Sequence, residues 1–273
     1  DADQKVAIPY QATAFFIDRE GRLATNRHVA VPWEYRSKQD ENVIRSAVEK
    51  WLESFTYENF EKNSELAFAQ TIYNYALATT PNLTLERFHK TRSKLISRLN
   101  KSKYTISGEM DYITVGYPGR YYTHTDEFDR CSVVSESGTD DKDIAILQMN
   151  DKKTPDNIKY IFEVKNFYTD KLEPLKDKLY TIGYPNGVVW AMDSKMQSLE
   201  PAIRETMCSK MPSKYTFDFQ GESVGGASGS PIFNEKGQLV GVLWGRRPEG
   251  ITFGRACQAK YLKEMYNEEL GYE

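Results

Sequence analysis

A glycine- and serine-rich segment that runs straight into a strand pattern limits the folds open to this chain. Residues 221–230 read GESVGGASGS, and the apolar stretches PIF and LVGVLW follow within a few positions. Ordering so many glycines is entropically costly. The pattern therefore favours a shaped backbone turn that leads into a sheet, although such stretches are more often plain loops.

Strand and turn patterns recur in both halves of the chain. Residues 15–29 read as strand, turn and strand, with the turn at 18–21, and residues 231–244 repeat this rhythm with a turn at 234–237. Further short strands are expected from about residue 104 in DYITVGYPG, RCSVVSE, DIAILQM and KLYTIGYP. Such spacing predicts a largely antiparallel β protein made of two similar units.

The apolar period changes between these two halves. Apolar residues recur every three or four positions in three segments between residues 43 and 99, which predicts three amphipathic helices. A last helix is expected from about Ala259 to Leu270, with Leu262, Met265 and Tyr266 on one face. The sequence therefore predicts a helical insertion in a β protein and a helix at its C-terminal end.

The composition excludes several function classes. A net charge of −3, with basic residues spread along 273 residues, does not indicate a nucleic-acid surface, and no apolar run could span a bilayer. Three cysteines without CxxC spacing supply neither a disulfide framework nor zinc ligands. We expect no metal and no cofactor. The chain opens on DADQKVAIPY, which leaves two compartments open: secreted or periplasmic, or a cytoplasmic fragment of a larger protein.

Amide hydrolysis by a serine would explain why this segment contains so many glycines. That reaction needs a base, an acid that orients the base, and backbone N–H groups that hold the developing oxyanion. The N–H groups of Gly226 and Ser228 can converge on one point only where the backbone turns tightly and no side chain blocks the substrate. Ser228 is thereby the candidate nucleophile.

The base must be one of three histidines. His89 lies on a predicted helix and is more readily structural, whereas His124 lies in the polar stretch YYTHTDE, an expected exposed loop. His28 ends the predicted strand in LATNRHVA. Among the acids, Asp143 precedes the buried strand of DIAIL, where a carboxylate must be paired.

The order His28, Asp143, Ser228 carries more weight than any single residue. Asp143 and Ser228 are 85 residues apart, against roughly 93 in the chymotrypsin template, and His28 precedes Asp143 by a longer interval that the helical insertion explains. The blocks ATNRHV, DIAIL and GGASGSPIFNEKGQLVGV resemble those of trypsin-like serine proteases. They are most similar to bacterial glutamyl endopeptidases and high-temperature-requirement proteases.

The resemblance implies an all-β chymotrypsin-like fold of two six-stranded β-barrels with the triad between them. A three-helix insertion would interrupt the first barrel, and a helix would close the chain. The expected division is 1–35 with 104–150 for the first barrel, 36–103 for the insertion, 151–258 for the second barrel and 259–273 for the C-terminal helix.

The resemblance also implies a pocket for the residue before the scissile bond, formed by Glu222, Leu243, Trp244, Gly245 and Gly250. An acid at Glu222 would select Lys or Arg, unless it pairs with a nearby arginine. Two departures matter: Ala227 replaces the acid that many animal members use in activation, and Leu243 replaces the histidine of glutamyl endopeptidases.

These patterns predict a serine endopeptidase acting on a protein or peptide substrate. Its catalytic residues would be His28, Asp143 and Ser228, and the N–H groups of Gly226 and Ser228 would form its oxyanion hole. Two alternatives stay open. One is an inactive protease-fold module that binds partners, and the other is a protease effector domain of a larger signalling protein, regulated by a partner at the helical insertion.

Overall fold

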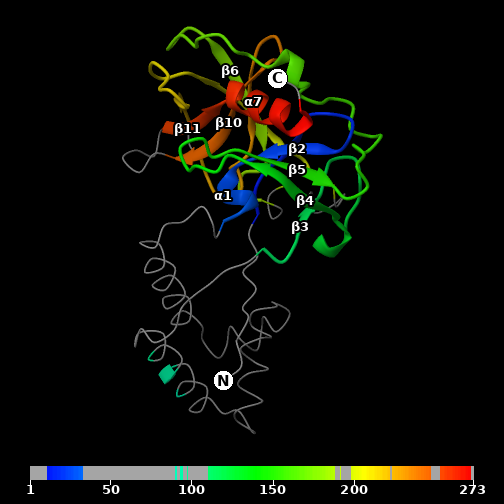
Figure 1. Cartoon of the computed structure of the whole chain (residues 1–273). Coiled ribbons are helices and arrows are strands. Elements are labelled where there is room, and N and C mark those ends of the chain that lie inside the picture. The colour runs from blue at the N-terminus through cyan, green and yellow to red at the C-terminus, as the bar shows by residue number, and fades with distance from the viewer. Residues whose placement is uncertain are drawn as a thin grey trace. The chain divides into compact units, whose positions relative to one another are not determined.

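The chain divides into two compact units, residues 1–10 with 36–108 and residues 11–35 with 109–273. The computed structural model describes residues 11–32, 90, 93, 94, 97, 110–187, 191, 198–221, 223–246 and 253–271. Every strand and helix named below lies in the second unit (Figure 1). The predicted helices of the insertion lie outside the described residues, apart from four isolated positions. These helices and the regulatory partner expected at them stay predictions.

An antiparallel five-stranded sheet is formed by the N-terminal part of the second unit. Its order is β1-β2-β5-β4-β3, and all neighbours in it are antiparallel. The strands are β1 (Phe15–Phe16), β2 (Arg22–Thr25), β3 (Ile113–Val115), β4 (Asp129–Glu136) and β5 (Ala145–Met149). The hairpin β1–β2 and the strand of DIAIL were both predicted, and β5 is buried at four of its five positions.

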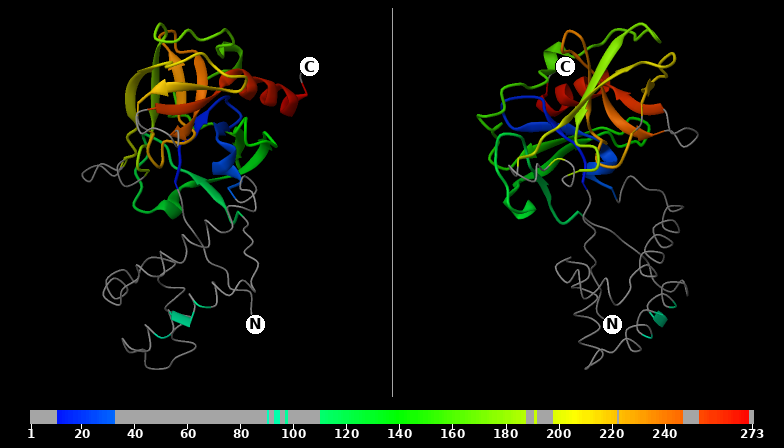
Figure 2. Two further views of the ribbon diagram at one scale, coloured as in Figure 1. Left: turned by 90° about the vertical axis from the view of Figure 1, so that its left-hand side faces the viewer. Right: turned by 180° about the vertical axis from the view of Figure 1, so that it is seen from behind.

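A second antiparallel sheet has six strands in the order β7-β6-β9-β10-β11-β8. Its yellow and orange strands lie together in the upper part of both views in Figure 2. They are β6 (Lys178–Gly183), β7 (Ala202–Met207), β8 (Thr216–Gln220), β9 (Pro231–Asn234), β10 (Leu239–Arg246) and β11 (Phe253–Gln258). The predicted hairpin at the end of the Gly/Ser-rich segment is β9–β10. The two curled sheets fit the double-barrel architecture expected from the sequence.

The sequence predicted six strands in each barrel; the second sheet has six, and the described part of the first sheet has five. Residues 150–177, which connect β5 to β6, contain no strand, only the 3-10 turn η2 (Val164–Asn166). A single backbone bond ties this connection to β1, from Phe162 N–H to the Phe16 carbonyl at 3.0 Å. One isolated bond does not make a ladder, so β1 is the edge strand of the described sheet on this side.

A short helix replaces the predicted end of the strand at His28. α1 (Arg27–Ala30) begins after Asn26, whose backbone is extended and whose carbonyl accepts the N–H groups of Val29 and Ala30. Arg27 also holds this helix in place, because its guanidinium pairs with Glu136 at the end of β4 and with Asp140 (2.9 Å) just after it. The second short turn, η1 (Thr125–Glu127), follows the exposed His124.

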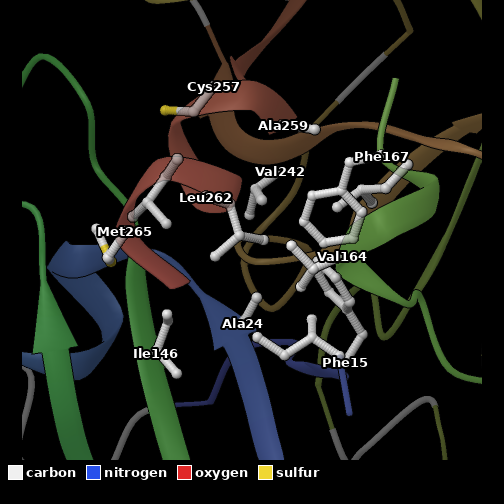
Figure 3. Close-up of a cluster of buried hydrophobic side chains, with 13 residues drawn as sticks. Phe15, Ala24, Ile146, Val164, Phe167, Val242, Cys257, Ala259, Leu262 and Met265 are labelled. Atoms are coloured by element: carbon white, nitrogen blue, oxygen red, sulfur yellow. The ribbon is translucent and has the colours of Figure 1, made fainter. Parts of the chain in front are cut away.

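The last helix joins the two sheets through one apolar cluster. α7 (Ala259–Leu270) has the predicted bounds and ends at Gly271, which adopts the left-handed conformation. Leu262 and Met265 pack with Ala24 and Ile146 of the first sheet and with Val242 of the second (Figure 3). Burying each such side chain is worth about 1.5–3 kcal/mol. The helix therefore stabilises the relative position of the sheets.

Two further predictions concern the described residues. Cys131, Cys208 and Cys257 are buried and form no disulfide. No helix in the described ranges is long and apolar enough to cross a membrane.

Candidate active site

The end of β2 and the approach to β5 bring His28 and Asp143 together. The His28 Nδ1 atom lies 2.7 Å from Asp143 Oδ2, and the His28 backbone N–H donates to Asp143 Oδ1 at 2.9 Å. Asp143 is fully buried, while the His28 side chain keeps 27% of its exposure. One carboxylate therefore fixes both the backbone and the ring of His28, and an ionised carboxylate requires that Nδ1 carry the proton.

The backbone at Asp143 departs from ordinary strand geometry. Its φ is +35°, a value uncommon for residues with a side chain, and such strain is frequent at functional sites. Burial raises the pKa of the Asp143 carboxyl above its ordinary value, and the hydrogen bonds and charge of His28 act in the opposite direction. Holding this carboxyl next to the imidazole therefore costs backbone strain and desolvation of the carboxylate.

Asn26 links the two residues through the backbone. Its side-chain amide donates to the Asp143 carbonyl at 2.9 Å, and its own carbonyl begins α1. Asn26 is fully buried. The sequence block that contains His28 is therefore tied to Asp143 at three points, two of them made by His28 itself.

The Gly/Ser-rich segment forms a tight turn held by backbone bonds. The Gly225 carbonyl accepts the Asn186 N–H at 2.7 Å, and the Ala227 carbonyl accepts the Ser230 N–H at 3.0 Å. Gly226 has a φ of +88°, and a Cβ there would lie 2.5 Å from the Tyr184 carbonyl oxygen. Only glycine fits this position without displacing the turn at 184–187.

These carbonyl bonds also orient two amide protons. In a trans peptide the N–H points opposite to the carbonyl of the same peptide unit, so fixing the Gly225 and Ala227 carbonyls fixes the N–H groups of Gly226 and Ser228. Within the part of the chain that the structure describes, neither of these N–H groups donates a hydrogen bond. Two donors that are fixed in this way and have no acceptor among the described residues are the components of an anion-binding turn.

The Ser228 hydroxyl belongs to the same turn. Its Oγ donates to the Trp244 carbonyl on β10 at 3.1 Å, and Ser228 is partly buried. Gly229, the next residue, donates its N–H to the Leu243 carbonyl at 2.8 Å. Strand β10 therefore holds the turn through the backbone carbonyls of Leu243 and Trp244.

Thr13 connects this turn to the first sheet. Its N–H donates to the Ser228 carbonyl (2.8 Å) and its hydroxyl to the Gly226 carbonyl (2.8 Å). Its carbonyl accepts the hydroxyl of Thr25, the last residue of β2, at 2.8 Å. Because Asn26 follows Thr25 directly and His28 is three residues after it, this contact links the segment of His28 to the turn of Ser228.

The predicted specificity residues differ in their surroundings. Glu222 and Gly250 lie outside the described residues. Leu243 is fully buried in the core of the second sheet, so its side chain supports β10. Trp244 is partly buried, and a Cβ at Gly245 would meet no described atom within 4 Å.

A charged cluster borders Gly245; the sequence indicated Arg255 as a possible partner of Glu222, but it did not indicate Asp218. Arg255 on β11 pairs with Gly245 in the sheet, so its side chain stands on the face that Gly245 leaves open. Its guanidinium lies 5.7 Å from the Trp244 ring, and its Nε lies 3.2 Å from Asp218 Oδ1. Asp218 also pairs with Lys210 at 2.9 Å and is nearly buried. The described side of this site carries two cations and one anion.

No group of three His, Cys, Asp or Glu side chains that could hold a metal ion occurs among the described residues. The described residues instead supply a histidine paired with a carboxylate and, in the turn of Ser228, backbone amides, which suit proton transfer and oxyanion binding.

Comparison with known proteins gives a match to the trypsin-like peptidase domain over residues 122–242. This range contains Asp143 and Ser228, whereas His28 precedes it. No curated protein matches the chain. The serine endoprotease of Yersinia pestis is 10% identical with a TM-score of 0.50, and the match covers 98% of this chain and 60% of that chain.

Two bacterial protease structures match a smaller part. The protease domain of MamO from Magnetospirillum magneticum, in its apo form, is 16% identical with a TM-score of 0.37, over 50% of this chain and 67% of that chain. The active form of a protease of M. tuberculosis is 18% identical with a TM-score of 0.37, over 54% and 61% of the two chains. The chain thus spans about three fifths of the Yersinia and M. tuberculosis proteins.

The domain match and the two antiparallel sheets agree with the resemblance in the sequence blocks. A special relation to glutamyl endopeptidases stays a prediction, because the domain match concerns trypsin-like peptidases in general. Residues 122–242 match the trypsin-like peptidase domain, and the two antiparallel sheets fit the chymotrypsin fold.

Proposed function

We propose that the chain is a serine endopeptidase that hydrolyses peptide bonds through an acyl-enzyme. The observation that carries this proposal is the pair His28–Asp143, with Nδ1 and Oδ2 2.7 Å apart and the carboxylate fully buried. When Nδ1 donates to the carboxylate, the other ring nitrogen, Nε2, is left as a proton acceptor.

The proposed reaction begins at Ser228. Its hydroxyl turns about the Cα–Cβ bond, leaves the Trp244 carbonyl and gives its proton to His28 Nε2 as Oγ attacks the substrate carbonyl carbon. The N–H groups of Gly226 and Ser228 bind the oxygen on which negative charge develops. Asp143 stabilises the imidazolium that forms on His28.

The second half of the reaction restores the enzyme. The C–N bond of the substrate breaks, and His28 gives its proton to the leaving amine. A water molecule then attacks the acyl carbon while His28 accepts its proton, and the Ser228 oxygen leaves with that proton returned. No step requires a metal or a cofactor.

The alternative of an inactive binding module has less support. The usual sign of such a module is a lost catalytic group, whereas this chain has a histidine paired with a buried acid, a serine, and two amides that have no acceptor among the described residues. The effector-domain alternative concerns the helical insertion and is compatible with the same chemistry.

Replacing the nucleophile tests the proposal. Ser228→Ala removes one partly buried oxygen and should leave the fold intact, so hydrolysis of fluorogenic peptides should fall by roughly 10⁶ in kcat. His28→Ala should cost a similar factor because the two residues act as a unit. A Ser228→Ala variant that keeps most of the wild-type rate, at an unchanged melting temperature, contradicts the proposal.

A further inference from the structure

A buried threonine outside the triad holds the turn that carries Gly226 and Ser228. Thr13 is 3% exposed, and its N–H and hydroxyl together make three bonds to segments of the second sheet or its turns. The Thr13 N–H binds the Ser228 carbonyl, and the Thr13 hydroxyl donates to the Gly226 carbonyl while it accepts the Tyr184 N–H at 3.0 Å. The residue precedes β1, far from Ser228 in sequence.

The hydroxyl of Thr13 completes a set of bonds around Gly226. The peptide before the Gly226 Cα is fixed by Asn186, whose N–H binds the Gly225 carbonyl at 2.7 Å. The peptide after it is fixed by Thr13, whose hydroxyl binds the Gly226 carbonyl at 2.8 Å. Glycine has no side chain that restricts rotation at this point, so these two bonds set the direction of the Gly226 N–H.

The packing leaves little room for another arrangement. A Cβ at Gly229 would lie 1.9 Å from the Thr13 carbonyl, and a Cβ at Gly183 would lie 3.1 Å from the Thr13 hydroxyl. The backbones of two segments thus approach Thr13 closely. Its carbonyl also accepts the hydroxyl of Thr25, three residues before His28.

We propose that Thr13 is a positioning residue that holds the Gly226 N–H in line with that of Ser228 for oxyanion binding. This inference rests on the proposed function. The hydroxyl acts as a two-bond bridge between the Tyr184 N–H and the Gly226 carbonyl, and it contacts neither substrate nor reacting atoms. Its contribution is made through the turn, so it should affect the transition state more than substrate binding.

The test compares Thr13→Val with Thr13→Ser. Valine keeps the shape and removes the hydroxyl, whereas serine keeps the hydroxyl. On a fluorogenic peptide, Thr13→Val should lower kcat by about tenfold to a hundredfold, less than the loss of a complete oxyanion donor, with KM nearly unchanged. Thr13→Ser should stay within about threefold of wild type in kcat.

Thr154 offers a matched control. It is also 3% exposed, and its hydroxyl also donates to a backbone carbonyl, that of Asp18 at 2.6 Å, in the β1–β2 turn. Thr154→Val should lower the melting temperature about as much as Thr13→Val and leave kcat unchanged. Thr13→Ala is the second hydroxyl-free variant if valine prevents folding, because it adds no volume.

Two measurements separate positioning from simple destabilisation. A peptide boronic acid, which forms a tetrahedral adduct with a serine oxygen, should bind Thr13→Val more weakly by the factor lost in kcat, while a product peptide should bind equally well. Hydrogen exchange of the Tyr184 amide should accelerate in Thr13→Val and not in Thr13→Ser.

The outcomes separate the two proposals. An equal kcat in Thr13→Val and wild type, or equal losses in Thr13→Val and Thr154→Val, overturns the positioning role. A folded wild type that neither hydrolyses peptides nor binds the boronate overturns the proposed function and the catalytic role of Thr13 together. In that case faster exchange of the Tyr184 amide in Thr13→Val would still establish the hydrogen bond from Tyr184 to the Thr13 hydroxyl as a structural feature.

Discussion

The two regions that supply the candidate catalytic groups are held together by different kinds of bonds. On the first sheet, His28 and Asp143 are joined by side-chain bonds that involve ionisable groups, one of them fully buried. On the second sheet, the turn of Gly226 and Ser228 is held by backbone bonds and by positions where a Cβ does not fit. The first region should therefore be sensitive to charge and protonation, and the second to added atoms.

Asp143→Asn is the sharpest test of the first region. The asparagine keeps the shape but presents an amide to His28 and so favours the wrong tautomer. The same exchange in a chymotrypsin-fold protease lowers kcat by roughly 10⁴, and we expect a loss of that size here. Peptide hydrolysis measured at several pH values checks it, and a variant within about tenfold of wild type would separate Asp143 from the chemistry.

The same substitution also tests how the stability of the protein depends on pH. Because burial raises the native pKa of Asp143, the native state holds its proton more tightly than the unfolded chain does. The contribution of Asp143 to the free energy of unfolding therefore falls as pH rises from the ordinary aspartate range through the raised native pKa. Urea unfolding between about pH 4 and 8 should find the stability of wild type relative to Asp143→Asn falling with pH; a relative stability that rises would refute this.

Gly226→Ala probes the second region. The added Cβ would lie 2.5 Å from the Tyr184 carbonyl oxygen, so the turn must shift and one oxyanion donor should be lost, at a cost of roughly 10²–10³ in kcat. Gly237 is the matched control, since its φ is +73° and a Cβ there would meet no described atom within 4 Å. Gly237→Ala should share the backbone strain and keep kcat. Equal kcat values in the two variants would remove Gly226 from the oxyanion site.

The smallest expected effect concerns substrate choice beside Gly245. From the sequence we expect preference for Lys or Arg, lost in Glu222→Gln. The structure adds Arg255 on the same face as Gly245, so Arg255→Gln should improve cleavage after Lys or Arg by about tenfold, equivalent to 1.4 kcal/mol. Lys178→Gln, which removes an exposed pair with Glu205, is the control. Preference for Asp or Glu that disappears in Arg255→Gln would reverse the assignment.

The sequence predicted the parts of the fold that are encoded by local patterns. The hairpins β1–β2 and β9–β10 and the helix α7 follow from alternation, turn residues and an apolar stripe that ends before Gly271. Helix α1 was missed because four residues after a strand carry no helical period. Strands β7, β8 and β11 were also missed, and with them the Asp218–Arg255 pair that bridges β8 and β11.

Part of the candidate site could also be predicted from the sequence, and part of it could not. His28, Asp143 and Ser228 could be selected because their residue types and order match one chemistry, and the structure brings His28 and Asp143 into contact. Nothing marked Thr13 in the sequence, because a threonine before a strand is common and its role depends on Gly226, Ser228 and Tyr184, all of them distant in sequence. Contacts of this kind arise only when the two sheets meet.

Labelling with a fluorophosphonate probe tests the central claim most directly, because the probe reacts with a serine that is activated by a base beside an oxyanion site. Mass spectrometry of the labelled, digested chain should find the phosphonyl group on the peptide that contains Ser228. The label should be absent after heat denaturation and in His28→Ala. An unlabelled Ser228 in the folded wild-type chain, or labelling that survives in His28→Ala, would contradict the account.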